Sequence, residues 1–208
     1  RIHPKPDEGW HSYDSCRGDI ALIDLGSGKA RRLGTELYPF GVKISPDGRY
    51  VGAMCFAGFL PKPDGKIARF DLRVFAIDGS LQHLLADRVP DVRETAFSWS
   101  PGSDEIAYTT YGGDVSELVI LSVDGSRKMT AGNHGLPLGN QLGYPPLWSA
   151  DGGVVYCTRG RVHAVSRATG EVRNVTEKLG KSIIGIVHSL GSGAVREFDG
   201  PGSIVVLA

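Results

Sequence analysis

Cysteine is scarce in this sequence, and its spacing excludes the sites that cysteine most often builds. The three residues, Cys16, Cys55 and Cys157, are odd in number and far apart, and no pair has the spacing of a zinc or redox motif. We interpret them as small buried apolar residues. The six histidines never fall within four residues of one another. The sequence therefore predicts no metal site and no cofactor.

A net charge is also missing, because 23 Lys and Arg residues balance 23 Asp and Glu residues. Binding to nucleic acid or to an anionic membrane needs a local basic excess, so we predict neither partner. No apolar run approaches the length of a membrane span, and the N-terminus shows no signal-peptide pattern. The chain starts at Arg1 rather than Met. A missing leader therefore leaves the localisation open, and we favour the cytoplasm.

Catalytic motifs are absent as well. The string from Val187 to Gly191 is similar to a hydrolase nucleophile elbow, with Ser189 in the place of the nucleophile. That elbow needs glycine two residues before the serine and a helix after it, whereas this chain has Val187 before it and a Gly-Ser-Gly run after it. No phosphate loop, dinucleotide fingerprint or zinc-protease motif occurs. We assign no catalytic residue.

Glycine, in contrast, is abundant, with 29 residues, and it marks a repeated turn. Residues 38–54 predict a strand, a turn of sequence Ser-Pro-Asp-Gly at positions 45–48, and a second strand. Pro presets φ, Asp bonds its own backbone and Gly accepts a positive φ, so this is a hairpin signal. The pattern recurs at residues 96–109 and 145–157. A spacing of about 50 residues is typical of β-propeller blades.

A second turn series runs out of phase with the first and supports the same unit. An apolar run closed by a small turn occurs at residues 20–28, 74–79, 118–125 and 162–170, and a polar, often basic strand follows it. Two independent series thus predict a repeating unit of four strands.

The predicted fold is an all-β propeller fragment of four-stranded antiparallel blades over residues 19–208. After a lead-in loop or partial strand at 1–18, we place complete blades at about 38–87, 93–132 and 144–178, with partial blades at 19–34 and 182–208. Three blades with a half at each end cannot close a ring of the usual four to eight. We therefore expect the chain to be cut from something longer. Ile44, Trp99 and Trp148 share the slot before the turn serine, where we predict packing between blades.

The loops indicate which side of the propeller binds a substrate or partner. Short, uniform turns lie on one side of the predicted propeller. The other side carries longer segments, which we expect to be loops, at residues 57–70, 86–94 and 131–143. Variable loops on a rigid scaffold are where binding usually resides. The candidate residues for contacting a substrate or partner are Phe59, Lys62, Arg69, Arg93, Glu94, His134 and Tyr144.

The repeated strings Ser98-Trp99-Ser100-Pro101 and Leu147-Trp148-Ser149-Ala150-Asp151-Gly152 carry a resemblance. With the Ser-Pro-Asp-Gly turn at 45–48, they resemble the propeller repeats of TolB and of the prolyl oligopeptidase family of serine peptidases. The resemblance covers residues 19–176. In that family the propeller caps a C-terminal α/β-hydrolase domain that carries a Ser-Asp-His triad, of which this sequence has no motif.

The resemblance leaves two functions open. In the first, which we prefer because of the long 57–70 segment and the irregular tail, the chain is the non-catalytic propeller of a serine peptidase. It would gate or orient peptide substrates for a hydrolase domain of the same protein. In the second, it is a TolB-like module that binds a protein partner. Residues Ser103 and Ala150 depart from the turn pattern.

Overall fold

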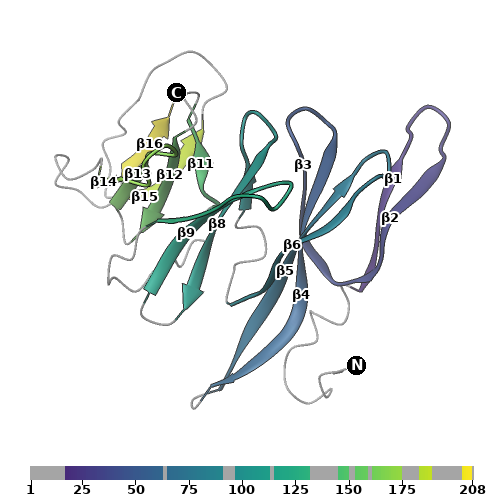
Figure 1. Ribbon diagram of the computed structural model, residues 1–208, viewed down its shortest axis with the longest axis horizontal. Helices are drawn as coiled ribbons and strands as arrows, with labels where there is room; N and C mark the ends of the chain where they lie inside the picture. Colours follow the sequence, from purple (N-terminus) through teal and green to yellow (C-terminus); the bar gives the residue numbers. More distant parts are fainter. Residues whose placement is uncertain are drawn as a thin grey trace. The chain divides into compact units, whose positions relative to one another are not determined.

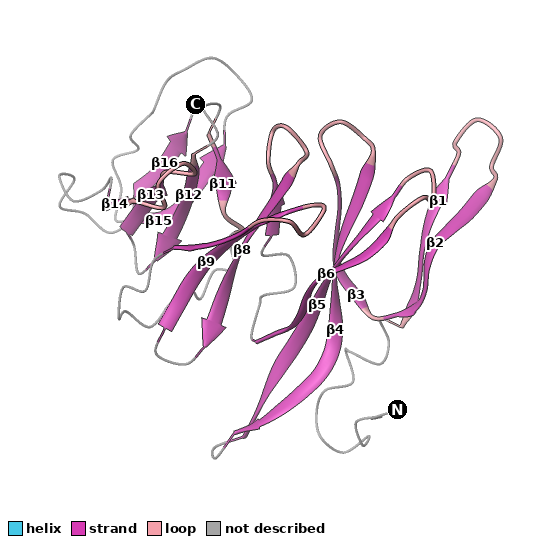
Figure 2. Ribbon diagram, viewed as in Figure 1, coloured by secondary structure: helices cyan, strands magenta, loops and turns pink. Residues whose placement is uncertain are grey.

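The computed structural model describes residues 17–62, 65–90, 97–112, 115–131, 145–149, 153–158, 161–174, 183–188 and 203–207. These described residues form strands and turns, and none of them is helical (Figure 2). The chain divides into two compact units, Arg1–Thr95 and Ala96–Ala208, which we call unit 1 and unit 2.

Unit 1 contains a two-stranded and a four-stranded antiparallel sheet (Figure 1). The smaller sheet pairs β1 (Gly18–Ile23) with β2 (Ala30–Leu37). The larger is a meander in which each strand pairs with the next, formed by β3 (Pro39–Ile44), β4 (Tyr50–Lys62), β5 (Gly65–Ala76) and β6 (Gln82–Pro90).

Unit 2 repeats the meander twice. The first sheet contains β7 (Phe97–Trp99), β8 (Glu105–Gly112), β9 (Val115–Ser122) and β10 (Lys128–Ala131). The second contains β11 (Leu147–Trp148), β12 (Val154–Thr158), β13 (Arg161–Val165) and β14 (Val172–Asn174). Four-stranded antiparallel sheets of this kind are the blades of β-propellers. The predicted all-β class is therefore confirmed.

The last two strands depart from that pattern. β15 (Ile183–His188) and β16 (Ser203–Leu207) pair in parallel rather than antiparallel. A parallel pair needs a crossover connection of about a dozen residues or more, and β15 and β16 are separated in sequence by more than that.

The predicted turn at 45–48 is confirmed. The amide of Gly48 donates to the carbonyl of Ser45 at 2.9 Å, and Gly48 has a φ of 72°. Asp47 accepts from the Ser45 hydroxyl at 2.7 Å and from the Arg49 amide at 2.9 Å. In the second copy, Ser103 takes the positive φ, at 62°, and Asp104 accepts from the Ser100 hydroxyl at 2.8 Å. The turn is therefore preserved although Ser103 departs from the turn pattern.

Each unit has a core between two sheets. In unit 1, Ile20 of β1 packs against Val51, Ala53, Cys55 and Phe75 of the larger sheet. A Cβ atom on Gly34 of β2 would lie 2.7 Å from Leu37 and 2.8 Å from Phe75, so any larger residue there requires these side chains to shift. In unit 2, Trp148 packs with residues of the preceding sheet, and both Trp99 and Trp148 are buried. The packing between sheets that we predicted is thus confirmed for Trp148, whereas Ile44 is 59% exposed, so the prediction is wrong there.

The prediction of a loop at residues 57–70 is wrong. Strands β4 and β5 continue through this segment, with Phe59 opposite Ala68 and Lys62 opposite Gly65. The pair therefore forms a hairpin that extends past the last residues paired to β3 and β6 (Figure 1). The signal in the sequence was Pro63-Asp64-Gly65, which has the same turn chemistry as positions 46–48. The loop expected at 86–94 is likewise wrong up to Pro90, because β6 includes those residues.

Candidate functional site

Five aromatic residues gather where the long hairpin of β4 and β5 leaves the four-stranded sheet. The ring of Phe56 lies 5.0 Å from Phe59, 5.9 Å from Phe70 and 6.4 Å from Tyr38, and Phe40 lies 6.0 Å from Phe70. All four pairs meet edge to face, a favourable geometry for aromatic rings. We call Tyr38, Phe40, Phe56, Phe59 and Phe70 the aromatic cluster.

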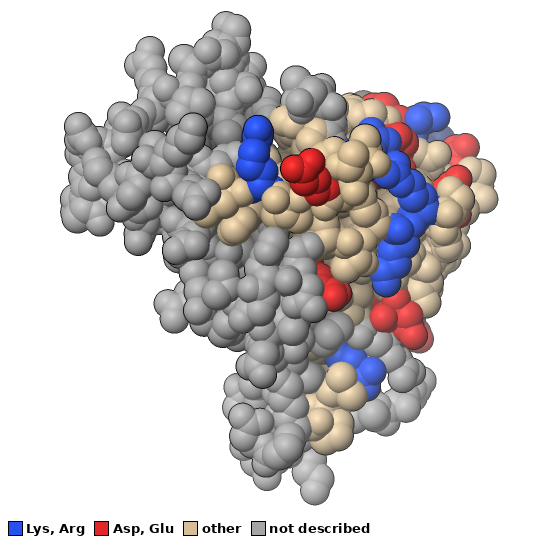
Figure 3. Space-filling model, turned by 60° about the vertical axis from the view of Figure 1, so that its left-hand side comes forward, with Lys and Arg blue, Asp and Glu red and all other residues tan. Residues whose placement is uncertain are grey.

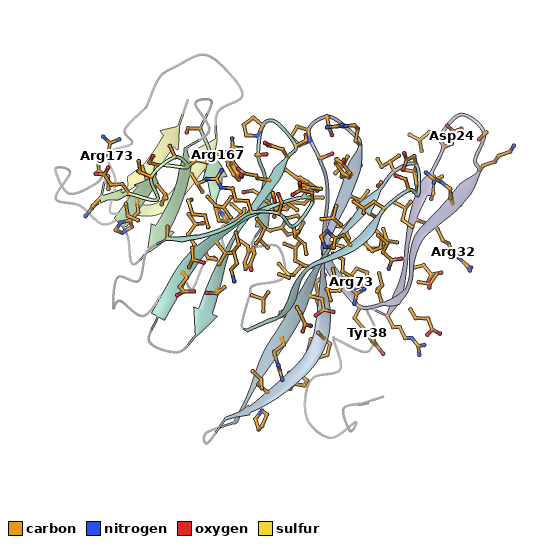
Figure 4. The ribbon with its side chains drawn as sticks, viewed as in Figure 1. Asp24, Arg32, Tyr38, Arg73, Arg167 and Arg173 are labelled. Atoms are coloured by element: carbon orange, nitrogen blue, oxygen red, sulfur yellow. The ribbon has the colours of Figure 1, made fainter. Side chains whose placement is uncertain are left out.

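The aromatic cluster is only partly covered. Phe70 is buried at its base, whereas the other four rings are half-buried. Tyr38 is tied to the sheet through its carbonyl, which accepts the Phe56 amide at 2.8 Å (Figure 4 labels Tyr38). Large aromatic side chains with part of their surface in solvent are the residues that most often anchor a bound protein or peptide.

Irregular strand pairing aims these rings at one another. In β4 the register shifts between Phe56 and Gly58, and Gly58 has a φ of 111°. Side chains three residues apart on a regular strand would point to opposite faces. The extra residue of this bulge turns Phe59 back toward Phe56, which explains their contact.

Two more irregularities lie at the same place. The register of β3 on β4 shifts between Pro39 and Gly41, which frees Phe40 to contact Phe70. The pairing of β5 with β6 shifts between Phe70 and Leu72. β-Bulges concentrate next to functional sites because they re-aim side chains. Two of the shifts insert an extra residue next to rings of the cluster, in β3 and in β4, and they are the strongest sign of a site in the described part of unit 1.

Basic and acidic side chains alternate with Phe70 along β5, so they lie on the other face of that strand. Arg69 is half-buried opposite Gly58, one residue before Phe70. Arg73 donates to Asp71 at 2.9 Å, and among the described residues its Nε has no hydrogen-bond partner (Figure 4 labels Arg73). Opposite Asp71 lies Cys55, whose thiol pKa burial raises to about 11. That thiol is therefore protonated and unreactive at neutral pH.

The opposite end of the four-stranded sheet is built differently. The Ile77 amide bonds the Arg49 carbonyl at 2.8 Å, which joins the turn after β5 to the turn after β3. In the turn after β5, Asp78 accepts from the Ser80 amide at 2.8 Å, and bonds from Ser80 lower its pKa. In unit 2, bonds from Ser122 and then Ser126 lower the pKa of Asp124 to about 2. These carboxylates accept hydrogen bonds within their own turns and stabilise them.

The structure brings together only part of the predicted candidate set. Phe59 and Arg69 lie on facing strands of the hairpin. Lys62 pairs with Gly65 near the hairpin tip, and its side chain lies outside the described part. Arg93, Glu94, His134 and Tyr144 lie outside the described residues. Sequence reasoning missed Tyr38, Phe40, Phe56 and Phe70, for which the signal was four aromatics flanking one predicted hairpin.

A cluster of charged side chains in unit 2 connects its two four-stranded sheets. Glu105 of β8 is buried, and its carboxylate lies 2.6 Å from Arg167 Nε and 3.4 Å from Arg127 Nη1. Arg167 follows β13 and also pairs with Asp104 at 3.1 Å (Figure 4 labels Arg167). Arg127 Nη2 donates to the Arg167 carbonyl at 2.7 Å. We interpret this cluster as structural because every member serves a bond between the sheets.

The described residues contain neither a metal-ligand cluster nor a membrane-spanning helix. They contain no group of three or more His, Cys, Asp or Glu side chains that could hold a metal ion. They also contain no helix that is long and apolar enough to cross a membrane. On the face drawn in Figure 3, acidic and basic side chains are both present among uncharged ones.

Comparison with known proteins gives a distant likeness in fold. No family model and no curated protein matches the sequence. Among solved structures, TolB from Acinetobacter baumannii is 12% identical, with a TM-score of 0.48, and the match covers 79% of this chain and 39% of TolB. The tricorn protease is 16% identical, with a TM-score of 0.48, and 76% of this chain and 15% of that one are covered.

A puromycin-hydrolysing peptidase from Mycobacterium tuberculosis is 17% identical, with a TM-score of 0.42, and the match covers 77% of this chain and 35% of the peptidase. The chain therefore spans well under half the length of these three structures. These distant likenesses to TolB and peptidase propellers assign no activity to it.

Proposed function

We propose that this chain is a non-catalytic β-propeller segment that binds extended polypeptide at the aromatic cluster and the adjoining hairpin. The observation that carries the proposal is the pair of bulges, in β3 and β4, that direct half-buried aromatic rings to one place. Packing alone would favour regular pairing, because a bulge leaves a residue unpaired and disrupts the ladder.

The chemistry of the surface suits a polypeptide. Half-buried aromatic rings supply apolar contact at low entropic cost, and Arg69, next to Phe70 in β5, adds a donor on the other face of the hairpin. Beyond Cys55 and before Arg69, β4 and β5 pair only with each other among the described residues. No third strand of the described part of the chain lies along this hairpin, and an extended peptide can pair with its outer edge.

The setting that we propose is a prolyl oligopeptidase-type serine peptidase, in which the hairpin orients peptide substrates for a hydrolase domain elsewhere in the protein. The repeated Ser-Pro-Asp-Gly-type turns and the length of the β4–β5 hairpin support this setting. The second candidate is a TolB-like interaction module, which the same half-buried aromatic rings favour. A Gly-x-Ser-x-Gly elbow downstream in the reading frame supports the peptidase, and a stop codon supports the module.

Binding can be tested with an unfolded polypeptide as the probe. We expect reduced, carboxymethylated α-lactalbumin to bind the chain, and Phe59→Ala with Arg69→Ala to weaken binding at least about tenfold, the effect of losing a hot-spot contact. The matched control is Asp78→Ala with Asp124→Ala, which changes two turns and no aromatic ring. Equal loss in both double variants, measured by calorimetry, would refute this site.

A further inference from the structure

Arg69 differs from the other charged side chains on its face of β5. Side chains alternate between the two faces of a strand, so Arg69 lies with Asp71 and Arg73 on the face opposite to Phe70. Arg73 and Asp71 pair with each other at 2.9 Å. Among the residues that the structure describes, no carboxylate pairs with Arg69, although its side chain is half-buried. A carboxylate from a ligand would complete this charge with a strong, charge-assisted hydrogen bond.

Gly58, which lies opposite Arg69 on β4, leaves room for such a ligand. A Cβ atom on Gly58 would meet no other atom within 4 Å, so no side chain fills the space between Arg69 and the outer edge of β4. Neighbouring strands lie about 4.8 Å apart, so a strand added at that edge would run about 10 Å from β5. The combined lengths of an arginine and a glutamate side chain span that distance.

The other face of the hairpin has a different chemistry. Phe56 faces Phe70 across the strand pair, and Phe59 faces Ala68. Tyr38 contacts the ring of Phe56 on the same face. The described side chains on this face of the hairpin are therefore aromatic or apolar and carry no charge. A bound strand meets aromatic rings on one face and a cation on the other.

We propose that the hairpin selects extended segments in which apolar and acidic residues alternate. Because successive side chains of a strand point to opposite faces, every second residue of the bound segment contacts the aromatic cluster. The residue between two such contacts faces Arg69 across Gly58, where a carboxylate is favoured and an ammonium group is repelled. This inference rests on the proposed function and names the class of polypeptide that the same site takes.

Three labelled peptides separate pattern and charge from composition. The first, Val-Glu-Phe-Glu-Val, has the proposed pattern, the second, Val-Phe-Val-Glu-Glu, has the same composition in blocks, and the third, Val-Lys-Phe-Lys-Val, has the opposite charge. In anisotropy titrations of the whole chain, we expect the first to bind at least about tenfold more tightly than either of the others. We also expect this preference to weaken as salt is added.

Two variants assign the preference to Arg69. Arg69→Ala should abolish the preference for the acidic over the basic peptide while the basic peptide binds no more weakly, which also shows that the variant is folded. Arg49→Ala is the matched control, because it removes an exposed arginine at the other end of the same sheet and should leave the preference unchanged.

The remaining outcomes contradict the inference, and one of them also contradicts the proposed function. If neither the peptides nor reduced, carboxymethylated α-lactalbumin binds, the proposed function is wrong as well. If α-lactalbumin binds in a way that Phe59→Ala weakens but the three peptides bind equally, the site is real and the alternating pattern is wrong. A preference for the acidic peptide that persists in Arg69→Ala would assign the contact to another cation.

Discussion

Replacing Gly48 by Val should destabilise unit 1 through backbone strain alone. Gly48 has a φ of 72°, in the left-handed region that a β-branched residue adopts poorly. A Cβ atom there would meet no other atom within 4 Å, so the side chain causes no collision. We therefore expect a loss of about 1 to 3 kcal/mol in the free energy of unfolding, the usual cost of a residue held in a sparsely populated conformation.

Two matched variants separate strain from other effects. Gly48→Asn should cost less than Gly48→Val, because Asn tolerates the left-handed region. Gly18→Val introduces the same side chain where a Cβ atom also meets open space and φ is not positive, so its effect should stay within about 0.5 kcal/mol. Urea unfolding followed by circular dichroism gives each value from the midpoint shift. A Gly48→Val chain as stable as the wild type would refute the turn geometry.

Three further predictions follow from unit 2, the buried thiol and the sequence. Arg167→Ala should cost about 2 to 4 kcal/mol, because buried Glu105 then keeps only the longer contact to Arg127, and adding Glu105→Gln should restore part of that loss in urea unfolding. Burial raises the pKa of Cys55 from 9.0 to about 11, so the folded state holds that proton longer and stability should fall as pH rises from 9 to 11. Cys55→Ala should flatten this part of a pH titration of stability, and an unchanged slope would contradict the assignment. The isolated chain should not hydrolyse short-peptide or aminoacyl chromogenic esters, and turnover that Ser189→Ala abolishes would show a site that we have missed.

The repeat could be predicted from the sequence because its turn chemistry is local. Pro46, Asp47 and Gly48 act on their own backbone, so the hairpin and its positive φ follow from adjacent residues. Ser103 in the left-handed region shows the limit of that reasoning, because Gly102 stands beside it and does not take the positive φ.

The candidate site could be predicted only in part. Phe59 and Arg69 were candidates because of their segment, although the segment is a hairpin and not a loop. The aromatic cluster depends on two register shifts between strands, and a shift of one residue reverses which face a side chain takes. Such shifts depend on pairing between strands and leave no local pattern, except for Gly58 at the bulge.

Photo-crosslinking tests the central claim most directly, namely that polypeptide binds at the hairpin end of the unit 1 sheet. A benzophenone amino acid in place of Phe59 should crosslink to reduced, carboxymethylated α-lactalbumin, and the same group in place of Asp78, at the other end of β5, should not. Crosslinking from the Asp78 position alone would contradict the account, because it would place the binding surface among the short turns.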